Sequence, residues 1–254
     1  MKITDYVETL AREGALLAAA AGRAGVDATV PTCPRWRVRD LLGHTGAVHR
    51  WAAGFVREAL TEPVPFPDLP EPADDEVLPW YREGHAALVR TLAGAPADLR
   101  CWTFLPDPPS AAAFWARRQA HETTVHRMDA QAALGVAFSP VEPGFAQDGV
   151  DELLTGFHAR PRSRVRTPEP RVLRVRAADT GAVWTVRLSS EPPRTVRGDA
   201  DPADPSGPAG APDCEVTGDA AWLYAALWNR LPLTGPGVTG DLSLARLWST
   251  ASAI

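Results

Sequence analysis

The sequence has few cysteines, no excess of positive charge and no long run of apolar residues. Its three cysteines, Cys33, Cys101 and Cys214, are odd in number and far apart, which excludes a disulfide framework and a Cys-x-x-Cys metal knuckle. The net charge of -5 argues against the basic patch that a nucleic-acid interface needs. No apolar run could span a bilayer, and the first residues lack the layout of a signal peptide. We therefore expect a cytoplasmic protein that acts without nucleic acid or membrane.

The first half of the sequence contains four amphipathic segments with the periodicity of helices. Ser110 is a plausible N-cap for the last of them, and Gly135 would end it. Long amphipathic segments joined by loops predict a four-helix bundle. The predicted helices run from about Ile3 to Arg23, Pro34 to Leu60, Asp74 to Leu92 and Ser110 to Leu134.

The second half changes character and predicts a mixture of strands and helices. Apolar and polar residues alternate over Arg171–Ala177 and Val183–Leu188, which is typical of strands. The stretch Gly198–Pro212 is rich in Gly, Pro and Asp, and we expect a mobile loop there. A third strand is predicted at Cys214–Thr217, with helices at Val150–Phe157, Ala220–Leu231 and Leu242–Ser252. The predicted fold class is α+β, with a helical bundle over residues 1–160 and a smaller α+β domain over residues 161–254.

The second predicted helix carries a stripe of residues on one face, spaced three or four apart. The stripe consists of Leu41, His44, Val48, Trp51 and Phe55. We expect this face to point into the bundle, so that His44 replaces an apolar core residue. His49 lies off the stripe and is expected at the surface.

The fourth predicted helix places a carboxylate and an imidazole on one face. Its stripe consists of Trp115, Arg118, Glu122, His126 and Asp129. Burying Glu122 and His126 is costly unless something pairs with them. Glu and His at i and i+4 can chelate one ion, and a ligand from a facing helix would complete three protein ligands with one open position. This arrangement is typical of catalytic zinc. Asp129 could orient a liganding imidazole.

Spacing alone leaves two simpler interpretations open. An inward His44 can be a hydrogen-bonded core histidine, and an isolated Glu-x-x-x-His on a helix is usually a solvated pair. His121 lies next to Glu122 but about 100° round the helix, so it is less suited to be a ligand.

Three groups of motifs resemble one protein family, the mycothiol-dependent maleylpyruvate isomerases. The first is the run Cys33–His44 followed by Val48–Trp51, which is similar to the family's second-helix signature. The second is Ala120–Ala130, which is similar to its fourth-helix signature. The third group lies in the C-terminal half and consists of Trp184–Val186, Leu227–Leu233 and Gly240–Asp241. The resemblance implies a DinB-like helical bundle followed by a sterol-carrier-like domain.

The resemblance also implies a ligand set and a co-substrate. Family members bind zinc, and their ligands correspond to His44, Glu122 and His126. They use the actinobacterial thiol mycothiol, and an arginine of the C-terminal domain binds substrate; Arg230 is the best match here. Arg37 departs from the family pattern, which often has Ser or Thr there, so the start of the second helix is less well defined.

The activity implied is a metal-dependent thiol reaction on a small electrophile, either isomerisation or S-transfer. The substrate is expected in the cleft between the two domains. Two other classes fit the same scaffold. One is a metal-dependent hydrolase or rearrangement enzyme that uses no thiol. The other is a non-catalytic binding module.

Overall fold

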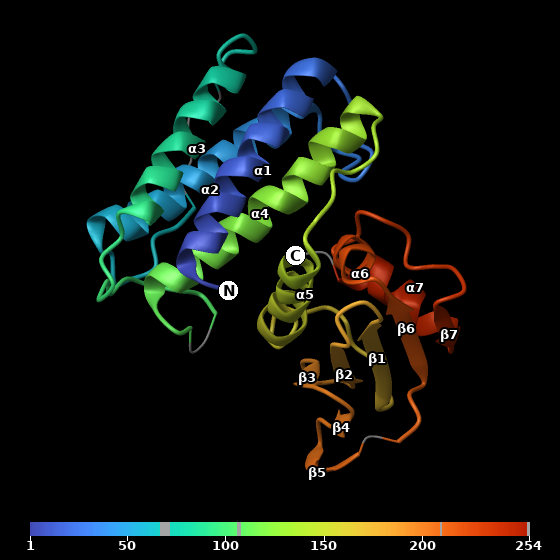
Figure 1. Cartoon of the computed structure of the whole chain (residues 1–254). Coiled ribbons are helices and arrows are strands. Elements are labelled where there is room, and N and C mark those ends of the chain that lie inside the picture. The colour runs from blue at the N-terminus through green and yellow to red at the C-terminus, as the bar shows by residue number, and fades with distance from the viewer. Residues whose placement is uncertain (67–71, 106–107, 209, 253–254) are drawn as a thin grey trace. The chain divides into compact units, whose positions relative to one another are not determined.

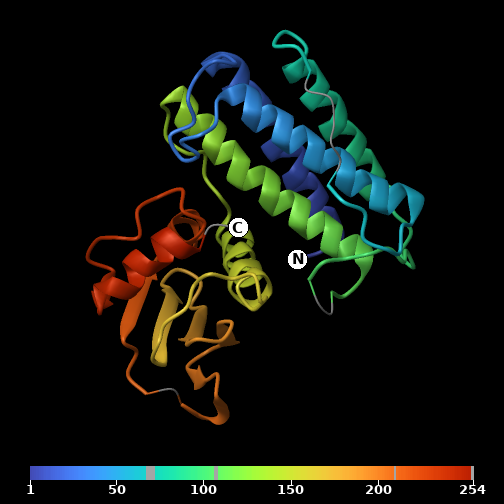
Figure 2. The same ribbon diagram turned by 180° about the vertical axis from the view of Figure 1, so that it is seen from behind.

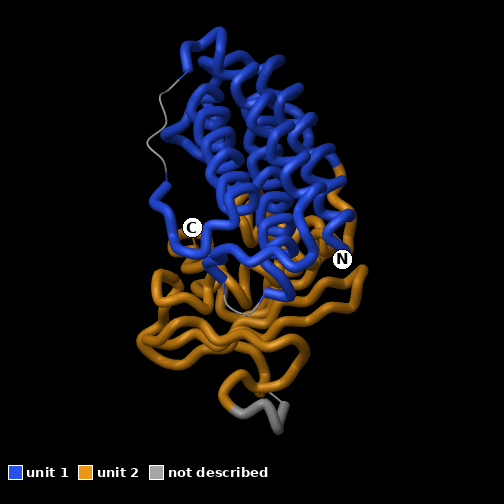
Figure 3. Tube along the Cα trace, turned by 90° about the vertical axis from the view of Figure 1, so that its left-hand side faces the viewer, with its two compact units in different colours: residues 1–139 blue, residues 140–254 orange. Residues whose placement is uncertain are grey.

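The chain folds into two compact units, residues 1–139 and residues 140–254 (Figure 3). The computed structural model describes residues 1–66, 72–105, 108–208 and 210–252. The units divide between Ser139 and Pro140 and not near residue 160. The reason is that helix α5 (Pro143–Asp151) packs against α6 (Ala220–Leu227) of the second unit.

The first unit is a bundle of four helices, α1 (Ile3–Ala24), α2 (Val38–Glu58), α3 (Val77–Ala93) and α4 (Ala111–Leu134) (Figure 1). α1 packs against α4 and α3, and α2 packs against α3 and α4. The helices therefore form a ring in the order α1, α4, α2, α3, which makes α2 and α4 neighbours. In the part of the chain that the structure describes, no helix is long and apolar enough to cross a membrane.

Local hydrogen bonds explain where the site-bearing helices begin and end. Ser110 Oγ accepts from the amide of Ala113, and Gly135 ends α4 with a φ of 74°. Both features were predicted. The start of α2 was predicted too early, at Pro34, because residues 33–36 form a turn in which the Trp36 amide donates to the Cys33 carbonyl. The helix begins at Val38, where the Asp40 carboxylate accepts from the Arg37 amide at 2.7 Å.

The second unit is built on a five-stranded mixed sheet with the order β3-β2-β1-β6-β7, whose strands are labelled in Figure 1 and seen from behind in Figure 2. The strands are β1 (Arg171–Ala177), β2 (Val183–Leu188), β3 (Arg194–Arg197), β6 (Cys214–Gly218) and β7 (Val238–Gly240). β1 pairs in parallel with β6 and antiparallel with β2. The predicted alternation in β1 is confirmed, since Leu173, Val175 and Ala177 are buried. The α+β class of the chain is therefore confirmed.

Several elements of the second unit differ from the sequence prediction. The helix expected at Val150–Phe157 is the end of α5 followed by a π-helix, Glu152–Phe157. Part of the expected loop Gly198–Pro212 forms a two-stranded sheet of β4 (Ala200–Asp201) and β5 (Asp204–Pro208). α6 stops at Leu227, because Asn229 adopts a positive φ of 60°. The final helix, α7 (Leu242–Ala251), was predicted correctly and packs against β6 and β7.

Candidate metal site

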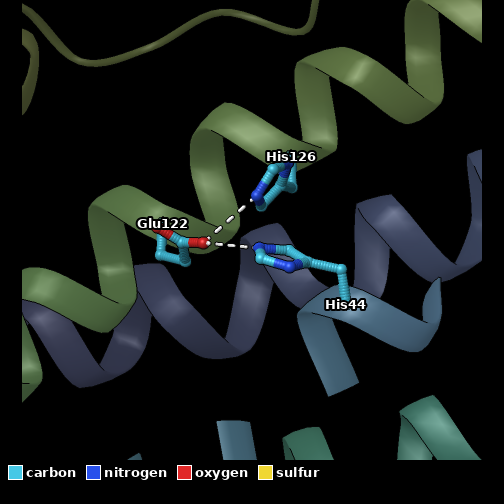
Figure 4. A group of neighbouring side chains, drawn as sticks. All are labelled: His44, Glu122 and His126. Carbon is cyan, nitrogen blue, oxygen red and sulfur yellow. Dashed lines mark hydrogen bonds and ion pairs between the residues drawn. The ribbon is translucent and has the colours of Figure 1, made fainter. Parts of the chain in front are cut away.

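Three side chains with metal-binding atoms meet between α2 and α4 (Figure 4). His44 comes from α2, whereas Glu122 and His126 come from successive turns of α4. Glu122 Oε1 lies 3.4 Å from His44 Nε2 and 3.1 Å from His126 Nε2. One ligand atom from each residue lies within 4.8 Å of the other two. The fold thus brings together the three residues that the sequence indicated.

The donor set fits a divalent transition metal. Tetrahedral zinc with bonds of about 2.0–2.1 Å places neighbouring ligand atoms about 3.3 Å apart. Both distances from Glu122 Oε1 are close to this separation. Imidazole nitrogen and carboxylate oxygen are also donors that zinc accepts. Three protein ligands would leave one coordination position for a small molecule.

The cluster lies at the edge of the bundle rather than in its centre. The His44 side chain is 35% exposed and that of Glu122 is 21% exposed. The expectation that His44 points into the core is therefore corrected. α2 packs against both α3 and α4, so its buried face centres on Thr45, His49 and Ala52. His44 lies beside that face, where a small molecule can reach it.

Two other histidines of the bundle are buried outside the cluster. His49, which was expected at the surface, is fully buried, and its Nε2 lies 2.9 Å from Thr123 Oγ1. The surface assignment was wrong because α3 covers the flank of α2 that the stripe leaves out. His121 is fully buried and contacts the ring of Tyr6 edge-on.

Asp129 orients the imidazole of His126. Its Oδ2 accepts a hydrogen bond from His126 Nδ1 at 2.8 Å, which leaves Nε2 directed at Glu122. Two residues of the loop between α1 and α2 contact the same carboxylate. Thr32 Oγ1 donates to Asp129 Oδ1 at 2.5 Å, and Cys33 Sγ lies 3.8 Å from Oδ2. Such contacts behind a ligand fix its tautomer and ring orientation.

Charged partners control protonation at the cluster. Burial would lower the pKa of His126, but its hydrogen bonds to Asp129 and Glu122 outweigh burial and raise the pKa to about 9. Burial would raise the pKa of Glu122, yet hydrogen bonds from His126 and His44, with the charge of Arg118, hold it well below its usual range. Arg118 Nη2 donates to Glu122 Oε2 at 3.0 Å. The ionised carboxylate is the form that binds a metal.

Aromatic residues that the sequence analysis did not assign to the site surround His44. The ring centroid of Trp36 lies 4.9 Å from that of His44 and 5.7 Å from that of His126. Phe66 stacks on His44 from a centroid distance of 6.2 Å. Trp36 belongs to the Cys33–His44 motif of the second helix, so the sequence contained a signal that Trp36 lies near His44. Phe66 lies between the second and third predicted helices, which end and begin at about Leu60 and Asp74, and nothing in the local sequence links it to His44.

Arg230 belongs to the second unit and follows α6. Its Nη1 donates to the carbonyl of Trp228 at 2.7 Å. The side chain is therefore held by the turn that ends α6. Its role in substrate binding stays a prediction.

The fold and the site define a class of protein: a helical bundle with a two-histidine, one-carboxylate cluster, followed by an α+β domain. Comparison with family models makes the assignment more specific. Residues 7–131 match the mycothiol maleylpyruvate isomerase N-terminal domain, and residues 145–247 match the C-terminal domain of the same family. The chain belongs to the mycothiol maleylpyruvate isomerase family.

Solved structures support the fold over nearly the whole chain. The chain is similar to the crystal structures of a mycothiol-dependent maleylpyruvate isomerase and of a variant of it in which a histidine is replaced by alanine. Each comparison gives a TM-score of 0.62 at 12% identity and covers 95% of this chain and 93% of the other. No curated protein sequence matches the chain.

Proposed function

We propose that this protein is a metal-dependent thiol enzyme, which uses mycothiol to isomerise a small electrophile or to transfer sulfur to it. The observation that carries the proposal is the cluster of His44, Glu122 and His126, partly open to solvent, in a chain of this family. Zinc is the metal that the donor set favours.

Each residue of the site has a definite task in this proposal. His44, Glu122 and His126 would hold the metal, and Asp129, by accepting from Nδ1, leaves Nε2 as the nitrogen that would bind once the metal displaces its proton. Arg118 occupies Glu122 Oε2, so that Oε1 is the oxygen directed at both histidines. A bound zinc ion would supply a thiolate at neutral pH, which is the nucleophilic form of the thiol.

The reaction follows from the chemistry of a thiolate with a conjugated carbonyl compound. The sulfur adds to one carbon of a double bond. The former double bond is then a single bond, and rotation about it becomes possible. Expulsion of the thiolate completes an isomerisation, whereas protonation of the neighbouring carbon retains the sulfur as a thioether. The three-residue cluster would supply the same thiolate for isomerisation and for thioether formation, so it does not distinguish the two reactions.

Metal analysis and spectroscopy of full-length protein test the proposal. We expect about one zinc per chain, and His126→Ala should lose most of it because one of three ligands is removed. With cobalt in place of zinc, added mycothiol should produce a thiolate-to-metal charge-transfer band in the near ultraviolet. A variant with Cys33, Cys101 and Cys214 replaced by serine controls for the protein's own thiols.

Two results would count against the proposal. Equal metal in wild type and His126→Ala would refute the ligand assignment. A cobalt spectrum that saturating mycothiol leaves unchanged in the cysteine-free variant would refute thiol coordination. Activation of a water molecule for hydrolysis, the second use of such a site, would then be the better interpretation. Retained metal without turnover of any kind would instead indicate a binding module.

A further inference from the structure

A row of aromatic side chains extends from His44 toward solvent. Phe66 stacks on His44 with an angle of 26° between the rings, and the Phe66 centroid lies 5.9 Å from that of Trp51. Trp36 contacts His44 from another direction, at 4.9 Å. Phe66 is 50% exposed and Val64 is 43% exposed. Apolar surface is therefore displayed to solvent directly beside a proposed metal ligand.

The backbone before Phe66 is held in place. Trp51 Nε1 donates to the Val64 carbonyl at 3.0 Å, and the Trp102 amide donates to the Leu60 carbonyl at 2.7 Å. These two bonds fasten the segment that follows α2 to the bundle.

The support beneath Phe66 is itself a packed aromatic cluster. Trp51 packs edge-on against the buried Trp115, with centroids 5.4 Å apart. Phe55 stacks on Trp115 at 5.1 Å. A rigid, exposed aromatic surface loses little conformational entropy when a ligand covers it, so it is suited to binding.

Apolar rings lie against His44 on this side of the site. Among the residues that the structure describes, Phe66 contacts the His44 ring from the segment after α2, and Trp36 contacts it from the loop before α2. Arg118, a cationic side chain at the cluster, pairs with Glu122. A ligand that reaches His44 along Phe66 therefore meets apolar, planar surface. Aromatic pairs contribute to binding beyond the burial of their area.

We propose that Phe66, supported by Trp51, is a specificity-determining residue that selects electrophiles with a planar apolar group, such as an aryl ring, next to the reactive carbon. This inference rests on the proposed function, because it names the substrate class of the same site. The ring of the electrophile would cover Phe66, and its reactive carbon would then lie beside the cluster.

Two enones that differ in one substituent test the inference. Benzalacetone carries a phenyl group on its reactive carbon, and ethylideneacetone carries a methyl group there. In each case mycothiol adds across the double bond. A sulfur–carbon bond forms, the carbon–carbon π bond breaks, and the proton of the thiol is transferred to the carbon next to the carbonyl group. The quantity to compare is the ratio of the two kcat/KM values, each divided by the rate constant without protein.

We expect wild type to favour benzalacetone and Phe66→Ala to lower the ratio about tenfold, which is the effect of losing one aromatic contact with its buried area. Phe66→Leu, which keeps the apolar character, should lower the ratio less. The matched control is Val136→Ala, since Val136 is also an exposed apolar residue of the first unit, at 40% exposure. It should leave the ratio unchanged.

Binding of benzylacetone, the saturated and unreactive analogue, separates this inference from the proposed function. Ligand-detected NMR should show that it binds wild type and that Phe66→Ala weakens binding about tenfold. If this happens while neither enone reacts faster with protein, the thiol function fails and the aromatic site stands. If both enones react but Phe66→Ala changes neither their ratio nor benzylacetone binding, the inference is overturned and the proposed function stands.

Discussion

Thr32 and Asp129 lie 97 positions apart in the sequence and share a hydrogen bond of 2.5 Å between Oγ1 and Oδ1. The other oxygen of Asp129 accepts from His126. The loop between α1 and α2 is thereby connected to the His44–Glu122–His126 cluster through two hydrogen bonds. The conformation of this loop therefore bears on how well His126 is oriented.

Replacing Thr32 tests this connection. Thr32→Val keeps the shape of the side chain but removes the donor, so Asp129 is held less firmly. We expect zinc affinity to fall by about tenfold, which is typical for loss of a group behind a metal ligand. Competition with a chromophoric chelator measures the affinity. Thr32→Ser should remain close to wild type because it keeps the hydroxyl.

The control for Thr32→Val is Thr29→Val. Thr29 is exposed and lies in the same loop, where its backbone pairs with that of Arg37. Its side chain can change without altering that backbone pairing, and zinc affinity should not change. If Thr32→Val binds zinc as tightly as wild type, the hydrogen bond to Asp129 has no influence on the site.

The sequence predicted the helices of the bundle well because each carries a periodic apolar pattern. It also predicted the approach of His44 to Glu122 and His126, through spacing and family resemblance together. It could not predict which residues surround His44. Phe66 lies against His44 because the backbone after α2 runs back past that helix. The course of this backbone depends on tertiary hydrogen bonds such as that from Trp51 to Val64.

The error at His49 has a similar origin. A single apolar stripe defines one buried face, but α2 contacts α3 and α4 on two flanks. A polar residue between those flanks is buried whenever a partner such as Thr123 can pair with it. Periodicity carries no information about such a partner, because the partner lies on another helix.

A buried ion pair joins α1 to α4 and should be sensitive to the loss of either member. Arg127 and Glu13 are buried, and Arg127 Nε donates to Glu13 Oε2 at 2.8 Å. Arg127 Nη1 also donates to Gln131 Oε1 at 2.8 Å. Arg127→Met should lower the free energy of unfolding by about 3 kcal/mol, because the buried Glu13 carboxylate loses its buried partner and keeps the bond from the exposed Arg12, whose Nε donates to Oε1 at 3.1 Å. Urea denaturation followed by circular dichroism measures the change.

The comparison is an exposed pair on α2. Arg57 and Glu58 are 63% and 52% exposed, so Arg57→Met should change stability by about 0.5 kcal/mol or less. Adding Glu13→Gln to Arg127→Met should restore part of the loss, since the buried negative charge that lost Arg127 is removed. Equal effects of Arg127→Met and Arg57→Met would contradict the buried pair's role.

Gly14 provides the room that His85 needs between α1 and α3. A Cβ at Gly14 would lie 2.1 Å from His85 Nε2, which is hydrogen-bonded to the Leu10 carbonyl at 2.9 Å. Gly14→Ala should therefore destabilise the bundle by about 1–3 kcal/mol, as overpacking does. Gly54→Ala in α2 is the control, because a Cβ there meets nothing within 4 Å. It should stabilise by about 0.5–1 kcal/mol through helix propensity, and thermal unfolding distinguishes the two signs.

His158 in the second unit should make stability depend on pH. The side chain is 2% exposed, its Nδ1 lies 3.0 Å from Ser163 Oγ, and its ring contacts Trp248 edge-on at 4.7 Å. Burial lowers the pKa of His158 to about 4, and the charge of Arg166 acts in the same direction. In the unfolded chain a histidine has a pKa of about 6.5.

The sign of the effect follows from proton uptake. Between about pH 6.5 and pH 4 the unfolded chain binds the proton and the folded chain does not, so acidification favours unfolding. The contribution of the neutral His158 to the free energy of unfolding is fully present above about pH 6.5. It falls as the pH decreases and is lost near pH 4. The full difference amounts to about 3.5 kcal/mol, from roughly 1.4 kcal/mol for each of about 2.5 pH units.

The measurement compares His158→Gln with wild type at pH 7 and pH 4. Other groups also titrate in this range, but they are common to both proteins and cancel in the difference between them. We expect wild type to lose about 3 kcal/mol more stability than the variant over this interval. NMR titration of the His158 imidazole in the folded protein provides the direct check, with a midpoint near 4. A midpoint near the ordinary value of a histidine would show that water reaches the ring, and the pH dependence of stability would then need another source.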